Sequence, residues 1–126
     1  MKRFLYFWLP VLFWALLIFV LSSIPDLKSG LMSSWDLIVR KLAHMFEYAM
    51  FAILLLRAFR GGDRSRWYDY VSCILVGVLY AASDEVHQTV VAGRHGSIVD
   101  VGIDTFGILC GAFFWHLIHP KQKTGE

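Results

Sequence analysis

The chain of 126 residues is 57% hydrophobic and 17% charged, with a formal net charge of +2 and a mean hydropathy of +0.56. A soluble domain is nearer to about 45–50% apolar and about 25% charged residues, so the composition indicates an integral membrane protein. The positive residues gather at the borders of apolar stretches and form no basic stripe, so we expect no nucleic-acid partner.

The first predicted helix covers residues 4–21, a run of 18 residues without a charge, which is long enough to be a candidate membrane span. Lys2 and Arg3 precede this run, as in a secretory signal peptide. The run is longer than the roughly 7–15 residues of a signal-peptide core and ends in a weak cleavage site at best. We therefore expect a retained span, with Trp8 and Trp14 facing lipid.

The second and third predicted helices cover residues 36–57 and 67–88, and neither can span with uncharged residues alone. Their uncharged runs, 48–56 and 70–83, contain nine and 14 residues, fewer than the roughly 20 that a span needs. Both helices reach full length only by including acids and histidines. Asp36 is the expected N-cap of the second helix.

The fourth predicted helix covers residues 98–118, with Asp100 and Asp104 near its start and Pro120 after its end. Together the four helices predict an all-α fold, a bundle of four transmembrane helices. We expect residues 1–126 to form a single membrane domain.

Lys and Arg residues are unevenly divided between the two ends of this bundle. The N-terminus, the connection between the second and third helices and the C-terminus carry eight, against four at the other end. Because basic residues in short loops favour the cytoplasmic side, both termini are expected in the cytoplasm. The polar ends of the last three helices then face outward.

Charged and polar residues gather at this outward end, where helical spacing brings them to shared faces. Charges inside membrane segments are costly, so their clustering marks a functional site. The expected ligand-binding residues are Lys41, His44, Glu47, Tyr48, Asp84, Glu85, His87, Gln88, Arg94, Ser97, Asp100 and Asp104.

The cluster is formally negative, because two cations stand against five acids. A pocket of low dielectric does not hold a bare charge of −3. We therefore expect a protonated carboxyl, a charged histidine or a bound divalent cation. Carboxylates are the ligands that hard divalent cations prefer, and the candidate metal ligands are Asp84, Asp100 and Asp104.

The aspartates of the fourth helix share a face with Gly107 and Gly111. This GxxxG step lets two helices approach closely within a bilayer. The face is therefore expected to point into the bundle, with Asp100 and Asp104 directed away from lipid.

Three functions are compatible with an outward polar cluster. The first is binding of a cell-envelope ligand, such as a lipid-linked phosphate, a phospholipid head group or the lipid tail of a glycopeptide. The alternative is an intramembrane hydrolase or transferase acting on a lipid or envelope precursor, with Glu85 and His87 as the candidate catalytic residues. A proton relay is disfavoured, because the cytoplasmic halves of the helices lack matching polar residues except Ser72.

Four motifs follow one another along residues 41–111. They are Lys41-x-x-His44-x-Phe46-Glu47-Tyr48, Ser83-Asp84-Glu85-Val86-His87-Gln88, Gly93-Arg94-x-Gly96-Ser97-x-x-Asp100 and Asp104-Thr105-x-Gly107-x-x-x-Gly111.

With these motifs the chain resembles the VanZ-like family of small bacterial membrane proteins. It departs from the family pattern at Ala92, where many members have proline, and at Asp104, where many have asparagine. The resemblance implies a multi-pass protein of the bacterial cytoplasmic membrane, with membrane lipids as partners. The name-giving member is associated with low-level resistance to the glycopeptide antibiotic teicoplanin, so an envelope precursor or a glycopeptide is an expected ligand.

Overall fold

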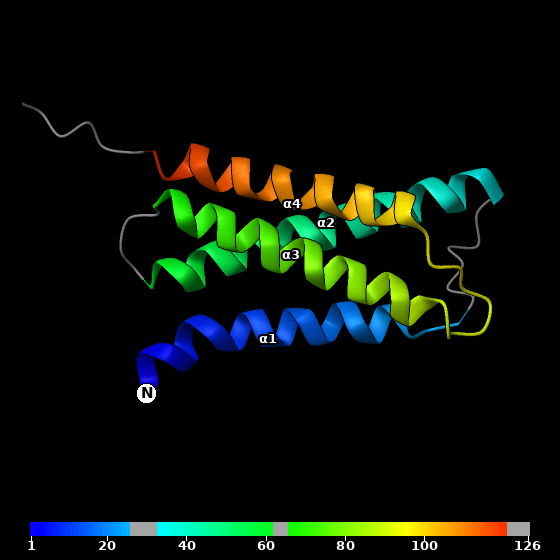
Figure 1. Ribbon diagram of the computed structural model, residues 1–126, viewed down its shortest axis with the longest axis horizontal. Helices are drawn as coiled ribbons and strands as arrows, with labels where there is room; N and C mark the ends of the chain where they lie inside the picture. Colours follow the sequence, from blue (N-terminus) through cyan, green and yellow to red (C-terminus); the bar gives the residue numbers. More distant parts are fainter. Residues whose placement is uncertain (26–32, 62–65, 121–126) are drawn as a thin grey trace, which may run out of the picture.

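The protein folds into a bundle of α-helices, and the described part of the chain contains no strand (Figure 1). The computed structural model describes residues 1–25, 33–61 and 66–120. The helices are α1 (Lys2–Ser22), α2 (Ser33–Arg60), α3 (Trp67–Gln88) and α4 (Ile98–Ile118).

The last two helices have the expected bounds, whereas the first two are longer than expected. α2 begins at Ser33, so the prediction of Asp36 as its N-cap was wrong. Asp36 lies in the first turn instead, where its buried carboxylate is 3.6 Å from Nε of Arg40. A negative side chain is favourable in the first turn of a helix as well as at its cap. Asp36 therefore indicates that a helix begins nearby but does not identify its first residue. α4 does begin with a cap, since Val99 N–H donates to Oγ of Ser97 at 3.2 Å.

Length and composition allow three of the four helices to cross a membrane, over Lys2–Ser22, Ser34–Arg60 and Ile98–Ile118. Four membrane spans were expected, and three helices are long and apolar enough to be candidate spans. α3 is not among them, because acids at both ends, with Asp69 near its start and Asp84 and Glu85 near its end, shorten its apolar stretch.

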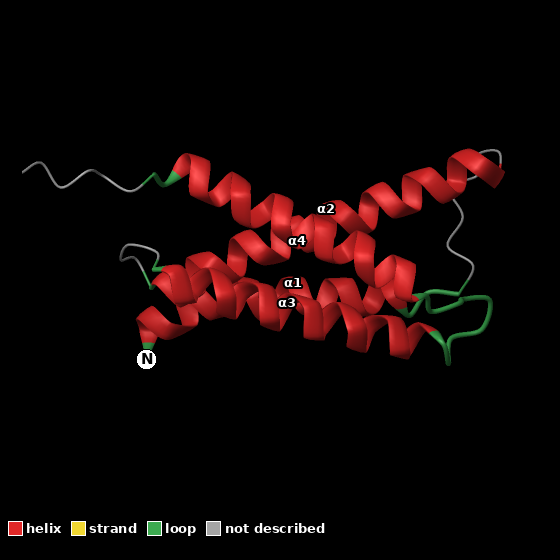
Figure 2. Cartoon of the chain, turned by 45° about the horizontal axis from the view of Figure 1, so that its top comes forward, coloured by secondary structure: helices red, strands yellow, loops and turns green. Residues whose placement is uncertain are grey.

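α2 and α4 cross at the centre of the bundle and make its most extensive helix pair (Figure 2). The glycine face of α4 permits this approach. A Cβ on Gly107 would overlap the carbonyl oxygen of Met45, and one on Gly111 would overlap that of Ala49. Close backbone approach at small residues is how membrane helices gain van der Waals contact.

α1 is the most exposed helix, but it is attached to the core by specific hydrogen bonds. The indole N–H of Trp14 donates to the carbonyl of Glu47 at 2.8 Å, and the hydroxyl of Tyr80 donates to the carbonyl of Ala15 at 2.6 Å. Trp8 packs edge-to-face on Phe59, with ring centroids 5.5 Å apart. Trp8 and Trp14 were expected to face lipid, and this was wrong, because both are partly buried against the core.

The two ends of the bundle differ in what they contain. The start of α1 and the end of α4 lie together at one end (Figure 1). The start of α2, the end of α3 and the start of α4 lie at the other end, together with the loop 93–97 (Figures 1 and 2). The expected site residues belong to this second end or to the helical turns next to it.

Candidate functional site

A cavity of about 330 Å³ opens at the second end, between α2, α3, α4 and the loop 93–97. Eight of the twelve expected site residues line it. They are Lys41, His44, Glu85, Gln88, Arg94, Ser97, Asp100 and Asp104.

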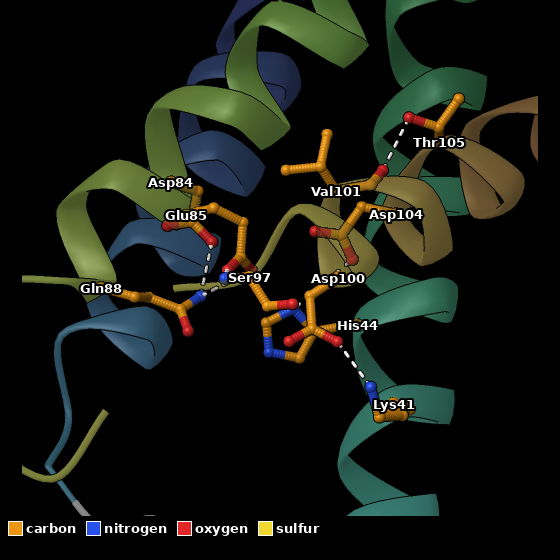
Figure 3. Close-up of polar contacts among 10 residues, drawn as sticks. All are labelled: Lys41, His44, Asp84, Glu85, Gln88, Ser97, Asp100, Val101, Asp104 and Thr105. Carbon is orange, nitrogen blue, oxygen red and sulfur yellow. Dashed lines mark hydrogen bonds and ion pairs between the residues drawn. The ribbon is translucent and has the colours of Figure 1, made fainter. Parts of the chain in front are cut away.

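An ion pair lies near the mouth of this cavity. Nζ of Lys41 is 2.6 Å from Oδ1 of Asp100, and the two side chains are 36% and 31% exposed (Figure 3). Pairs of this exposure are screened by solvent and contribute about 0–1 kcal/mol to stability. The Lys41 ammonium can therefore exchange its partner for a ligand at little cost to the fold.

Asp104 forms the floor of the cavity and is fully buried. Its Oδ1 lies 3.5 Å from Nδ1 of His44. Neither Asp104 oxygen accepts a hydrogen bond from any residue that the structure describes. Buried polar atoms are nearly always hydrogen-bonded. Among the described residues, the Asp104 carboxylate has only the long ion-pair contact with His44, so it keeps acceptor positions free at the cavity.

Glu85 is held against the cavity by two donors. The backbone N–H of Ser97 donates to its Oε2 at 2.8 Å, and the amide of Gln88 donates to its Oε1 at 3.4 Å and to Asp84 Oδ2 at 3.2 Å. A Cβ on Gly96 would overlap the carbonyl oxygen of Glu85. The loop can thus bring the Ser97 N–H to Glu85 only because residue 96 is a glycine.

Arg94 connects the same loop to the end of α1. Its guanidinium donates to the carbonyls of Leu21 at 3.1 Å and Ile24 at 3.2 Å while also lining the cavity. Arg94 therefore closes the cavity wall.

Four expected residues do not line this cavity. Glu47 lines a smaller neighbouring cavity of about 40 Å³. Tyr48 is part of the buried core, and Asp84 is buried beside Gln88. His87 faces α1, where its Nε2 is 2.9 Å from Oγ of Ser23.

The position of His87 bears on the alternative function, an intramembrane hydrolase or transferase. The His87 ring also stacks on Phe19, with centroids 4.6 Å apart, while Glu85 faces the cavity. The two candidate catalytic residues are thus turned toward different neighbours, and of the two only Glu85 lines the cavity.

Five lining residues were missed by the sequence reasoning: Leu37, Arg40, Gly93, His95 and Ile103. Arg40 matters most, because it balances the charge. Arg40 adds a third cation, and Glu47 and Asp84 lie outside the lining. Three cations of the lining therefore stand against three acids, and its formal charge with neutral histidines is zero. The six residues are Arg40, Lys41, Arg94, Glu85, Asp100 and Asp104. Arg40 lies four residues before His44, and this helical spacing could have identified it.

The structure does not bring the three candidate metal ligands together as one group. Asp100 is paired with Lys41, and Asp84 accepts from Gln88. The donors that converge are instead His44, Glu85 and Asp104, whose ligating atoms all lie within 4.8 Å of one another. Asp104 alone is common to the expected and the observed sets.

Apolar helices of spanning length, with a charged cavity at one end of the bundle, define an α-helical membrane protein. The chain matches the family model described as VanZ/LLP1 over residues 5–119, and it therefore belongs to the VanZ/LLP1 family. The family resemblance of the four motifs is thus confirmed. No curated protein and no solved structure matches the chain.

Proposed function

We propose that this protein is a multi-pass protein of the bacterial cytoplasmic membrane whose cavity faces outward and binds the polar head group of a cell-envelope lipid. The observation that carries the proposal is a charged cavity at one end of a bundle of apolar helices. Its volume of about 330 Å³ falls within the roughly 300–1,000 Å³ typical of small-molecule sites.

The orientation is supported by the distribution of charge along the chain. By sequence position, eight of the twelve Lys and Arg residues lie near the start of α1, between the last turn of α2 and the start of α3, or after α4. These helix termini form the end opposite the cavity (Figure 1). This bias favours a cytoplasmic location for that end. Both chain termini then lie in the cytoplasm, and the cavity opens on the outer side.

α3 is proposed as a fourth span despite its acids. It runs from one end of the bundle to the other, because it joins the end of α2 to the loop before α4 (Figure 1). Its 22 residues give a length of about 33 Å at 1.5 Å per residue, close to the roughly 30 Å hydrocarbon core of a bilayer. Asp84 and Glu85 are buried, so their charges do not contact acyl chains.

A phosphate-bearing head group matches the chemistry of the cavity. Arg40, Lys41 and Arg94 supply cationic donors, and such donors form strong charge-assisted hydrogen bonds with phosphate oxygens. The acyl chains of the lipid would remain in the bilayer beside the apolar helices. Binding of an envelope lipid would give the protein an accessory role in envelope homeostasis or in resistance to glycopeptides such as teicoplanin.

Native mass spectrometry of the protein released from mild detergent tests this proposal. The variant Lys41→Gln removes a cation from the cavity mouth, and Lys2→Gln removes one from the exposed start of α1 as a matched control. Loss of a charged hydrogen bond costs about 1.5 kcal/mol or more, so Lys41→Gln should retain roughly ten-fold less lipid. The mass of the retained lipid distinguishes a phospholipid from a lipid-linked precursor.

Equal lipid retention by wild type and Lys41→Gln would contradict the proposal. Teicoplanin susceptibility of a host expressing each variant tests the physiological part. We expect a host with Lys2→Gln to be as susceptible to teicoplanin as a host with the wild-type protein. A host with Lys41→Gln should be as susceptible as one that carries the empty vector.

A further inference from the structure

We infer that His44, Glu85 and Asp104 bind one divalent transition-metal ion at the floor of the cavity. Their ligating atoms converge within 4.8 Å although they come from α2, α3 and α4. Figure 3 shows the three side chains turned toward one another, with the loop residue Ser97 beside them.

Asp104 supplies the observation that points to a ligand. It is fully buried, it lines the cavity, and both of its oxygens lack a hydrogen-bond partner among the described residues. A carboxylate in this position is unfavourable unless its charge and its lone pairs are satisfied. The neighbouring Nδ1 of His44, at 3.5 Å, also lacks a hydrogen bond from the described residues. An ion between the two side chains would satisfy both.

Glu85 is already oriented as a metal ligand. The Ser97 N–H and the Gln88 amide each donate to one of its oxygens. Hydrogen bonds of this kind, made by groups behind the ligands, fix the ligand geometry in protein metal sites.

The donor set selects the kind of ion. One imidazole with two carboxylates suits Zn²⁺, Mn²⁺ or Fe²⁺, whereas Mg²⁺ and Ca²⁺ prefer oxygen ligands alone. A thiolate is not available, since Cys73 hydrogen-bonds to Ala52 in the core and Cys110 is exposed on α4. We therefore expect Zn²⁺ or Mn²⁺ to bind and Mg²⁺ not to compete.

Binding requires only a small inward movement. Ligands of a tetrahedral ion with bonds of about 2.0–2.2 Å lie about 3.4 Å apart, compared with the observed limit of 4.8 Å. Side-chain rotation covers a difference of this size. Three protein ligands leave at least one coordination position open toward the cavity. A phosphate oxygen of a bound head group could occupy that position, and this last statement alone rests on the proposed function.

Metal analysis of the 126-residue chain in detergent tests the inference. The protein is stripped with a chelator, titrated with Zn²⁺ or Mn²⁺ in the presence of excess Mg²⁺, and measured by native mass spectrometry and elemental analysis. We expect one ion per chain and a rise in the thermal unfolding temperature on binding.

Two variants remove a ligand and one serves as control. Asp104→Asn and Glu85→Gln preserve side-chain size and should weaken binding by more than about 100-fold, since loss of an outer hydrogen-bonding partner alone costs about 10–100-fold. Asp69→Asn changes another buried acid, which accepts from the Arg66 backbone N–H at the other end of the bundle, and should bind as wild type. Because two separate ligands are tested, misfolding of one variant does not decide the result.

The outcomes separate this inference from the proposed function, because the same mass spectra record lipid and metal. A stoichiometric ion without retained lipid supports the metal site and contradicts lipid binding. Retained lipid with no ion in wild type, or equal affinity in wild type, Asp104→Asn and Glu85→Gln, would overturn the metal site.

Discussion

Gly111 of α4 lies directly against the backbone of Ala49 on α2, so closely that a Cβ on the glycine would overlap the Ala49 carbonyl oxygen. Gly107 meets Met45 in the same way one turn earlier. Asp104 lies on the same face of α4, a further turn toward the cavity. The glycine contact therefore brings Asp104 to within 3.5 Å of His44. The close packing of α2 against α4 thus also positions the two side chains of the site.

Substitution of Gly111 by alanine is expected to destabilise the protein. The added Cβ meets backbone, which cannot rotate away, so overpacking should cost about 1–3 kcal/mol of unfolding free energy or more. Gly102→Ala is the matched control, because Gly102 is also in α4 and a Cβ there meets nothing within 4 Å. The control should be neutral or stabilising by up to about 1 kcal/mol. Reversible unfolding in detergent measures both, and a Gly111→Ala protein as stable as Gly102→Ala would show that the helices are not so closely packed.

The parts of this arrangement that lie within single helices could be predicted from the sequence. Helical spacing placed Asp100, Asp104, Gly107 and Gly111 on one face, and the close-packing step indicated that this face points inward. α3 and α4 have the predicted bounds because polar segments flank their apolar runs, and Ser97 caps α4 as such a residue should.

The relations between helices could not be predicted in this way. Periodicity places His87 and Gln88 on neighbouring faces of α3, but it does not say that one face meets α1 and the other the cavity. For the same reason, the sequence does not show which carboxylates converge with a histidine. Three aspartates are equivalent ligands in a sequence. Only the structure pairs Asp100 with Lys41 and places Asp104 beside His44 without a hydrogen bond from the described residues.

Tyr80→Phe is expected to weaken the attachment of α1. The Tyr80 hydroxyl donates to the Ala15 carbonyl at 2.6 Å, and hydrogen bonds between membrane helices contribute about 0.6 kcal/mol on average and at most about 1.7 kcal/mol. Tyr6→Phe removes a hydroxyl from an exposed ring of α1 and should leave stability unchanged. The two unfolding free energies are compared in the same detergent, and equal losses would indicate that the Tyr80 hydroxyl has no specific role.

Labelling of single cysteines tests the orientation of the bundle. Val90 follows α3 at the cavity end and is 80% exposed, and Trp67 starts α3 at the opposite end and is 74% exposed. In a Cys73→Ser, Cys110→Ser background, a membrane-impermeant thiol reagent should modify Val90→Cys in intact cells. Trp67→Cys should react only after the cells are lysed. The reverse pattern would place the cavity in the cytoplasm, and labelling of both sites in intact cells would contradict a span by α3.

Gly96→Ala is expected to weaken metal binding without altering any metal ligand. A Cβ at residue 96 would overlap the Glu85 carbonyl, so the loop must move away and the Ser97 N–H loses Glu85 Oε2, which it now meets at 2.8 Å. Loss of a hydrogen bond behind a ligand lowers metal affinity by about 10–100-fold. Gln88→Leu removes the other donor to Glu85 while leaving the backbone in place, and the same loss is expected. If both variants bind Zn²⁺ as wild type does, Glu85 is not held as a ligand by these two donors.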